Sequence, residues 1–172
     1  MFLARRIDER NTIYINHTFP TKKTSVKRFR HRVTLGVGGN VGDTKRRMKQ
    51  VWVYLGRVPH LERVQSGIIL QNPPFGHIEQ ACFYNTVIEI STSLQPRELL
   101  RLLWRIEKRF GRVRSFANAP RTLDLDIIFF NNRKVNSKEL TVPHPSWKER
   151  PSVLIPLHSL SGNKGQKIRR QL

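Results

Sequence analysis

The segment that most constrains the fold is residues 123–130, Leu-Asp-Leu-Asp-Ile-Ile-Phe-Phe. Apolar and acidic residues alternate there with a period of two, which is typical of a β-strand whose two faces differ. We expect Leu123, Leu125, Ile127 and Phe129 to face a hydrophobic core. The segment therefore predicts a strand with a core on one face and carboxylates on the other.

The two carboxylates are Asp124 and Asp126, whose Cα atoms would lie roughly 7 Å apart on that strand. Like charges at this distance repel, so each needs solvent, a cation or a proton. Paired carboxylates can bind Mg²⁺, which keeps water ligands and accepts phosphate oxygens. The alternative is an ordinary solvated strand face, and the alternation alone does not decide between the two.

Around this strand, β-type and helical patterns alternate. The order is β-α-β-β-α-β followed by extra C-terminal elements, so we expect an α+β protein with a ferredoxin-like antiparallel sheet and helices on one face. The expected elements are a strand at 33–37, a glycine-rich turn at 38–43, a helix from residue 43 or 44, strands at 64–70 and 83–90, a helix from Pro96 to Gly111, the strand at 123–130, a hairpin at 134–142 and a final helix within 147–160 broken by Pro151 and Pro156. The turn at 38–43 lacks the spacing of a nucleotide-binding loop, so we interpret it as a tight turn.

Charge is concentrated at the two ends of the chain. The 172 residues include 32 Lys and Arg against 12 Asp and Glu, a net charge of +20 that indicates an anionic partner. We interpret residues 1–32 as a basic N-terminal extension with one short strand at 13–15. Residues 33–160 would form the catalytic domain, and residues 161–172 a basic C-terminal tail.

Hydropathy and cysteine content exclude several classes of protein. No window approaches the roughly 20 apolar residues that a membrane helix needs, and no signal-peptide core follows Arg5 and Arg6. The single cysteine, Cys82, excludes an internal disulfide and a cysteine zinc site, and we expect it to be buried. These features favour a cytoplasmic protein with no membrane partner.

Two further segments could bind phosphate. Residues 111–121 contain Arg112, Arg114 and Arg121, and guanidinium groups suit phosphate oxygens. His144 lies between two prolines, and it could reach a phosphate chain together with Arg150. The alternatives are a solvent-exposed basic loop and a structural histidine.

Taken together, these motifs resemble the family of 6-hydroxymethyl-7,8-dihydropterin pyrophosphokinases of folate biosynthesis. The resemblance covers residues 33–160, and its most specific part is Arg-Thr-Leu-Asp-Leu-Asp followed by Val-Pro-His. The segments that carry it are residues 39–43, 72–76, 83–85, 105–107, 111–114, 120–127 and 140–144.

The resemblance implies transfer of pyrophosphate from ATP to the hydroxymethyl group of the pterin, with release of AMP. It implies that Asp124 and Asp126 hold two Mg²⁺ ions, and that Arg112 and Arg121 act with them in catalysis. The implied nucleotide-binding residues are Glu107, Arg112, Arg114, Arg121, His144 and Arg150. The implied pterin-binding residues are Asn72, Pro73, Phe75, Phe83 and Asn85, with Asn85 reading the pterin edge and Phe83 stacking on the ring.

The chain also departs from the family pattern. Asn118 stands where the family often has a Trp, and Pro151-Ser152-Val153 stands where a second stacking aromatic is common. The extension at residues 1–32 has no counterpart that we can place. No general base is assigned, because metal coordination could suffice to activate the hydroxyl.

Two other functions are compatible with part of the sequence. The charge and the β-α-β-β-α-β order would also suit an RNA-binding module, but no strand carries its aromatic signature and the two aspartates would repel a phosphate backbone. Nucleic acid is therefore not an expected partner. A degenerate pyrophosphokinase that binds nucleotide without turnover is disfavoured by the intact aspartates, arginines and His144.

Overall fold

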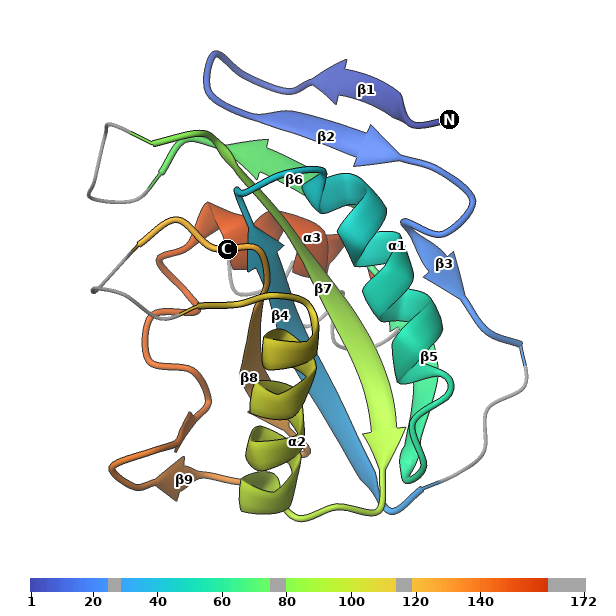
Figure 1. Ribbon diagram of the computed structural model, residues 1–172, viewed down its shortest axis with the longest axis vertical. Coiled ribbons are helices and arrows are strands. Elements are labelled where there is room, and N and C mark those ends of the chain that lie inside the picture. Colours follow the sequence, from blue (N-terminus) through green and yellow to red (C-terminus); the bar gives the residue numbers. More distant parts are fainter. Residues whose placement is uncertain (25–28, 75–79, 114–118, 161–172) are drawn as a thin grey trace.

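The computed structural model describes residues 1–24, 29–74, 80–113 and 119–160. This part of the chain forms an α+β fold, as the sequence predicts, with three helices packed on a large antiparallel sheet (Figure 1). The elements are β1 Leu3–Arg6, β2 Thr12–Ile15, β3 Thr21–Lys22, β4 His31–Gly39, α1 Thr44–Leu55, β5 Leu61–Ser66, β6 Ile69–Asn72, β7 Phe83–Thr92, α2 Pro96–Arg109, β8 Asp124–Phe130, β9 Val135–Asn136, β10 Thr141–Val142 and α3 Pro151–His158.

The main sheet has the order β1-β2-β6-β7-β4-β8, and β5 also pairs with β7 while β3 pairs with β5. From β4 to β8 the chain follows the expected β-α-β-β-α-β order, with β5 and β6 together in the place of the second strand. The long strands β4 and β7 run antiparallel through the middle, and β8 is on the other side of β4. The predicted hairpin after β8 is confirmed as the pair β9 and β10.

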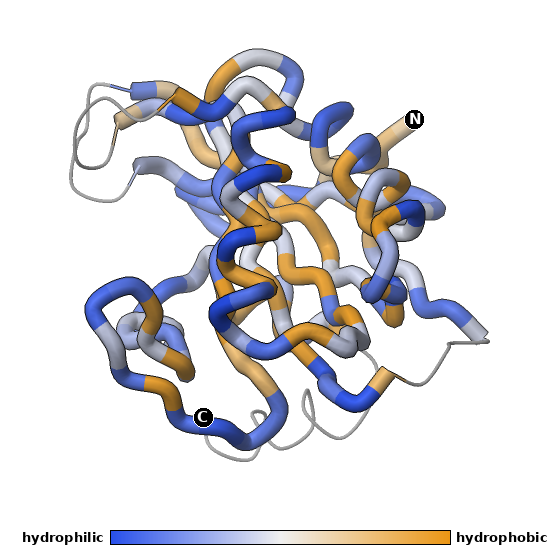
Figure 2. The backbone as a smooth tube through the Cα atoms, turned by 60° about the horizontal axis from the view of Figure 1, so that its bottom comes forward, coloured by the Kyte–Doolittle hydropathy of each residue, from blue (hydrophilic) through white to orange (hydrophobic). Residues whose placement is uncertain are grey.

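Helices α1 and α2 cover one face of the sheet and form the main hydrophobic core with it (Figures 1 and 2). Asp43 caps α1 by accepting a hydrogen bond from the Arg46 amide, and Pro96 occupies the first turn of α2. Gly111 follows α2 with φ of +80°, a conformation that favours glycine. The apolar stripes of the two helices face inward, and their fully buried members include Met48, Val51, Leu55, Leu99, Leu103 and Ile106.

Helix α3 packs on the opposite face, where a smaller cluster joins Val153 and Leu157 to Val87 and Ile128. The expectation of helices on one face therefore holds for α1 and α2, while α3 is one of the extra C-terminal elements. The sequence predicts that Pro151 and Pro156 break this helix. Instead Pro151 starts it, where its missing amide hydrogen costs nothing, and Pro156 lies inside it.

Three local expectations were wrong. The run at 64–70 is two strands, β5 and β6, because the chain turns at Gly67, where a Cβ would lie 2.5 Å from the Pro156 carbonyl oxygen. Phe129 does not face the main core, because a bulge opposite Thr34 and Leu35 reverses the alternation and turns it toward Trp147. Cys82 is exposed, since it lies outside the sheet just before β7.

The N-terminal residues form more structure than one short strand. The expected strand at 13–15 is present as part of β2, which pairs with β6 and extends the main sheet. Strands β1 and β3 were not expected, and Phe19 between β2 and β3 is completely buried in the main core. Within the described part of the chain, none of the helices has the length and apolar character required to traverse a bilayer.

Candidate active site

A cavity of about 340 Å³ opens on the α3 side of the sheet, above strands β4, β7 and β8. Residues from distant parts of the chain meet there, including the segment before β7, the start of β8 and the beginning of α3. The predicted site residues that line it are Asn72, Pro73, Phe83, Asn85, Arg121, Asp124, Asp126, His144 and Arg150.

Two glycines of β4, Gly36 and Gly38, form the floor of this cavity. The sheet register places Gly38 between Asn85 on β7 and Asp124 on β8, and it places Gly36 beside Asp126. A Cβ at Gly38 would lie 2.5 Å from the Asn85 Oδ1 atom. The absence of side chains along the middle strand therefore leaves room between the amide on one side and the carboxylates on the other.

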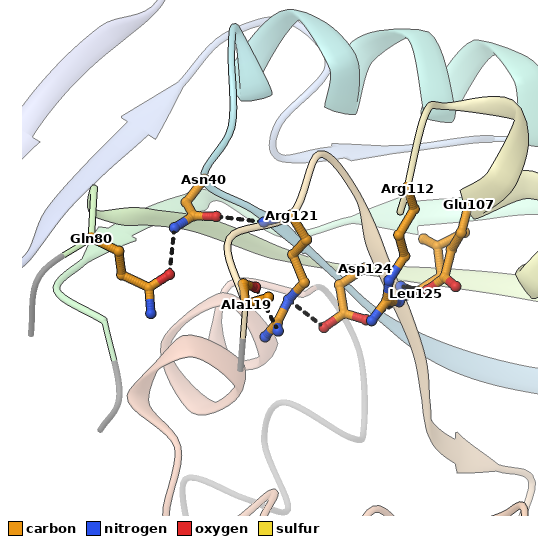
Figure 3. Close-up of polar contacts among 8 residues, drawn as sticks. All are labelled: Asn40, Gln80, Glu107, Arg112, Ala119, Arg121, Asp124 and Leu125. Atoms are coloured by element: carbon orange, nitrogen blue, oxygen red, sulfur yellow. Dashed lines mark hydrogen bonds and ion pairs between the residues drawn. The ribbon is translucent and has the colours of Figure 1, made fainter. Parts of the chain in front are cut away.

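Asp124 lies between two arginines at the edge of the cavity (Figure 3). Arg112 Nη1 donates to Asp124 Oδ1 at 2.5 Å, and Arg121 Nε is 2.9 Å from Asp124 Oδ2. Arg112 also donates to Glu107 through the same nitrogen. Burial would lower the pKa of Arg112, but the charges of Asp124 and Glu107 raise it above the ordinary value, so the guanidinium remains charged.

Glu107 reaches the site from the other face of the sheet. Glu107 is only 2 % exposed, and its Oε1 accepts a hydrogen bond from the Leu125 amide at 2.8 Å. Burial raises the pKa of Glu107, against that hydrogen bond and the charge of Arg112. Neither Glu107 nor Arg112 lines the cavity, so both are placed to hold the start of β8 and to orient Asp124.

Asp126 is the most perturbed carboxyl of the site. Burial, followed by the negative charges of Asp124 and Glu107, raises the pKa of Asp126 to about 7, and Arg112 and Arg150 oppose this effect only partly. Although the whole chain is strongly basic and Arg121 and Arg150 line the cavity, nearby positive charge does not offset the burial of Asp126 and its repulsion by the other two carboxylates. A carboxyl group in a cavity whose pKa is strongly shifted is typical of a functional site.

The segment that carries Arg121 is fixed to the turn after β4 (Figure 3). Asn40 Oδ1 accepts from the Arg121 amide at 2.9 Å, and the Arg121 carbonyl accepts from the Asn40 amide at the same distance. The Asn40 side chain also donates to Gln80 and to the Ala81 carbonyl. The glycine-rich turn thus connects the segment before β7 to the segment before β8 through the hydrogen bonds of Asn40. This structural role is consistent with its interpretation as a tight turn.

The side of the cavity formed by β6 and β7 carries amides and an aromatic ring. Asn85 Nδ2 donates to Asn72 Oδ1 at 2.7 Å, and Asn72 Nδ2 donates to the Pro73 carbonyl. The Arg121 guanidinium lies 5.1 Å from the centre of the Phe83 ring. A planar, polar-edged heterocycle suits these walls, because the amides offer donors and acceptors and the ring offers a π-face.

His144 and Arg150 form the wall nearest α3. The His144 amide donates to the Ile128 carbonyl at 3.0 Å, which fixes this segment against β8. Its Nδ1 atom is buried, and no described residue forms a hydrogen bond with it. Burial and the nearby Arg150 lower the pKa of His144, while Asp124 raises it. Because His144 lines the cavity, a ligand there can contact its ring.

The donor set indicates which metal the site could hold. Among the described residues, no group of three or more His, Cys, Asp and Glu side chains could enclose an ion. Asp124 and Asp126 offer two hard carboxylates beside an open cavity, and a cation would offset the repulsion from Asp124 and Glu107 that, after burial, raises the pKa of Asp126. This set fits Mg²⁺, which completes its shell with water and phosphate oxygens.

Several lining residues were not anticipated from the sequence. Gly36 and Gly38 could have been found from their two-residue spacing on an expected strand, but Arg10 and Asn11 depend on the pairing of β2 with β6. Two predicted residues, Phe75 and Arg114, lie outside the described residues, as does Asn118.

Comparisons with known proteins agree with this geometry. The family model described as 7,8-dihydro-6-hydroxymethylpterin-pyrophosphokinase matches residues 34–162. The 2-amino-4-hydroxy-6-hydroxymethyldihydropteridine pyrophosphokinase of Helicobacter pylori is 41 % identical over 147 residues, which are 84 % of this chain and 90 % of that protein. Two proteins of the same name are also similar. The one from Campylobacter jejuni is 36 % identical over 81 % of this chain and 88 % of that protein. The one from Bacillus subtilis is 39 % identical over 72 % of this chain and 74 % of that protein.

Proposed function

The chain belongs to the 7,8-dihydro-6-hydroxymethylpterin-pyrophosphokinase family, and we propose that it transfers pyrophosphate from ATP to the hydroxymethyl group of 6-hydroxymethyl-7,8-dihydropterin, releasing AMP. The observation that carries the proposal is a single cavity with Asn72, Phe83 and Asn85 on one side and Asp124 and Asp126 on the other. The first group suits a pterin, and the second suits metal-bound phosphates.

The pterin would lie over Gly36 and Gly38, because these residues leave the floor of the cavity free of side chains. Asn85 is fixed by its hydrogen bond to Asn72, so its remaining acceptor would meet the donor edge of the heterocycle. Phe83 would supply the stacking surface. The ring so placed would direct its hydroxymethyl group across β4 toward β8.

The phosphates of ATP would bind at the β8 side, where Arg121, His144 and Arg150 line the cavity beside the two aspartates and Arg112 holds Asp124. Asp124 and Asp126 would hold Mg²⁺, two ions in our proposal, and the metal would neutralise phosphate charge when bound. Arg121 and Arg150 would orient the phosphate chain so that the pterin hydroxyl faces the β-phosphorus in line with the departing AMP oxygen. Positioning and charge neutralisation account for most of the catalysis in such transfers.

The two arginines that hold Asp124 in the free protein would serve the same reaction. Arg112 is fixed by Glu107 as well as by Asp124, so it keeps the carboxylate in place. Arg121 has the Phe83 ring on one side and Asp124 on the other, so it links the pterin side of the cavity to the phosphate side. We propose that Glu107 acts through Arg112 and the Leu125 amide, as a positioning residue.

The test is an assay that separates nucleotides after incubation of the protein with ATP, Mg²⁺ and the pterin. AMP should accumulate in equal amount to the pterin diphosphate, and neither should form when the pterin is omitted or EDTA is added. Formation of ADP in place of AMP would show a different phosphoryl transfer. Absence of any pterin-dependent product would refute the proposed function.

A further inference from the structure

The turn between β1 and β2 contributes two polar residues, Arg10 and Asn11, to the wall of the cavity. Both precede residue 34, where the match to the family begins. We propose that this turn is a substrate-binding wall in which Arg10 contacts the pterin. The inference rests on the proposed function, and it assigns part of pterin recognition to the N-terminal hairpin, which lies outside the family match.

The register of the sheet explains how a residue so early in the chain reaches the cavity. Thr12 on β2 pairs with Gln71 on β6, so the preceding residues continue alongside Asn72 and Pro73. Those two residues line the proposed pterin side of the cavity. Strand β2 is four strands from β8 in the sheet order, which at 4.8 Å per strand is roughly 19 Å. Arg10 therefore lies beside the pterin side and far from the two aspartates.

The turn itself is held in one conformation. Asp8 Oδ1 accepts hydrogen bonds from the amides of Arg10 and Asn11, both at 2.8 Å, and the Asn11 side chain donates back to the Asp8 carboxylate. Arg6 donates to the carbonyls of Asp8 and Glu9. These bonds fix the backbone from which Arg10 extends, so little conformational freedom remains to be lost in the turn on binding.

The hairpin is also anchored to the rest of the molecule. Tyr14 donates a hydrogen bond to Gln71 on β6, at 2.7 Å, and its ring packs on Tyr84 of β7. The Lys45 ammonium of α1 lies 4.1 Å from the centre of the Tyr14 ring and 5.9 Å from that of Phe2. Figure 1 shows the hairpin beside β6 and the start of α1. Strand β2 and Phe2, the residue before β1, are therefore attached to the rest of the fold that forms the cavity.

The side chain of Arg10 is available to a ligand. It is exposed, and within the described parts of the chain it forms no ion pair or hydrogen bond of its own. A guanidinium group is planar and carries five donors, so it can stack on a flat heterocycle or donate to oxygen and nitrogen atoms at its edge. Both modes suit a pterin held between this turn and Phe83.

The experiment compares Arg10→Ala with Arg10→Lys and with Arg5→Ala, measuring the KM values for pterin and ATP, kcat, and direct pterin binding by fluorescence. Arg5 lies on β1 of the same hairpin and does not line the cavity, so its variant controls for loss of one charge. Removing Arg10 should raise the pterin KM and Kd about tenfold, as expected for one lost charged contact. The ATP KM and kcat should change by less than about twofold, because the contact is the same in ground and transition states.

The lysine variant should recover only part of the pterin affinity, since it keeps the charge and loses the planar fork. Equal pterin KM and Kd in Arg10→Ala and Arg5→Ala, in a wild-type protein that releases AMP, would overturn this inference alone. A rise in the ATP KM instead of the pterin KM would overturn it as well, by assigning Arg10 to the nucleotide. A wild-type protein that neither binds the pterin nor releases AMP would refute the proposed function and this inference with it.

Discussion

The two faces of β4, β7 and β8 are built from the same stretches of chain and differ in what they expose. Toward α1 and α2, alternate residues such as Leu35 and Leu125 are at most 2 % exposed and close a dry core. Toward α3, their neighbours Gly36, Asn85 and Asp126 line the cavity. One face therefore supplies stability, and the other carries polar groups that a ligand can reach.

The difference shows how a sheet tolerates carboxylates that repel one another. Asp126 has a pKa raised to about 7, so in the free protein its charge is unfavourable. The apolar residues on the opposite face of the same strands compensate for this cost, because each buried side chain of that size contributes roughly 1.5–3 kcal/mol. Substitutions on the α3 face should consequently lower activity without lowering stability. Substitutions on the α1 and α2 face should lower stability and leave substrate binding unchanged.

The largest expected effect is on turnover in Asp126→Asn. Removing this carboxylate takes away half of the proposed metal ligands, and we expect kcat to fall about a hundredfold to a thousandfold. The free energy of unfolding should stay equal or rise, because repulsion between Asp126 and Asp124 is relieved. AMP release and urea unfolding on the same preparation measure both quantities. Near-normal turnover would remove Asp126 from the metal site.

The next effect is on stability in Leu35→Ala. Leu35 is completely buried between the sheet and the helices, so its truncation should lower the free energy of unfolding by about 2–5 kcal/mol. Denaturant titration measures this loss. The folded fraction should retain its KM for the pterin, since Leu35 does not line the cavity. A stability loss below that range together with a raised pterin KM would contradict the separation of the two faces.

A smaller effect is expected on substrate affinity in Gly38→Ala. The new Cβ would lie 2.5 Å from Asn85 Oδ1, so Asn85 must turn away from its hydrogen bond with Asn72. The pterin KM should rise about tenfold, because a displaced Asn85 would lose one well-placed hydrogen bond to the pterin. In an Asn85→Ala background the same substitution should cost little more, because the atom it collides with is gone. Fully additive effects of the two substitutions would refute this explanation.

The smallest effect is a pH dependence of stability that arises at His31, the first residue of β4 and the end of the strand away from the cavity. His31 is 1 % exposed, and burial, then the charges of Arg133 and Arg30, lower its pKa below 6.5. The unfolded chain therefore binds the proton more readily, so stability should fall as the pH decreases from 7 to 5. His31→Gln should show a weaker decrease in urea titrations at these pH values. An unchanged pH dependence in the variant would exclude His31 as its source.

The sequence predicted the elements with strong periodicity. The two long helices, α1 and α2, and the alternation of β8 up to Ile127 follow from local patterns that tertiary packing reinforces. Phe129 was misassigned because the bulge in β8 is set by pairing with β4, which no local pattern reveals. The site residues within the family motifs could be anticipated from the resemblance, since they are close to recognisable blocks of sequence.

The placement of Arg10 could not be predicted in this way. Its position depends on the register of β2 against β6, two segments more than fifty residues apart, and residues 1–32 show little hydrophobic periodicity. Contacts of this kind are decided by side chains such as Phe19 and Tyr14, whose partners lie on other elements. The sequence described a basic arm, whereas the structure shows a paired hairpin at the edge of the cavity.

The most direct test of the account is a crystal structure of the protein with Mg²⁺, the pterin and a non-hydrolysable ATP analogue. We predict the pterin over Gly36 and Gly38, with its edge at Asn85 and the analogue's phosphates beside Asp124 and Asp126. This result would place both substrates on the α3 face of the sheet. Well-defined density for either substrate outside this cavity, with the cavity itself empty, would contradict the account.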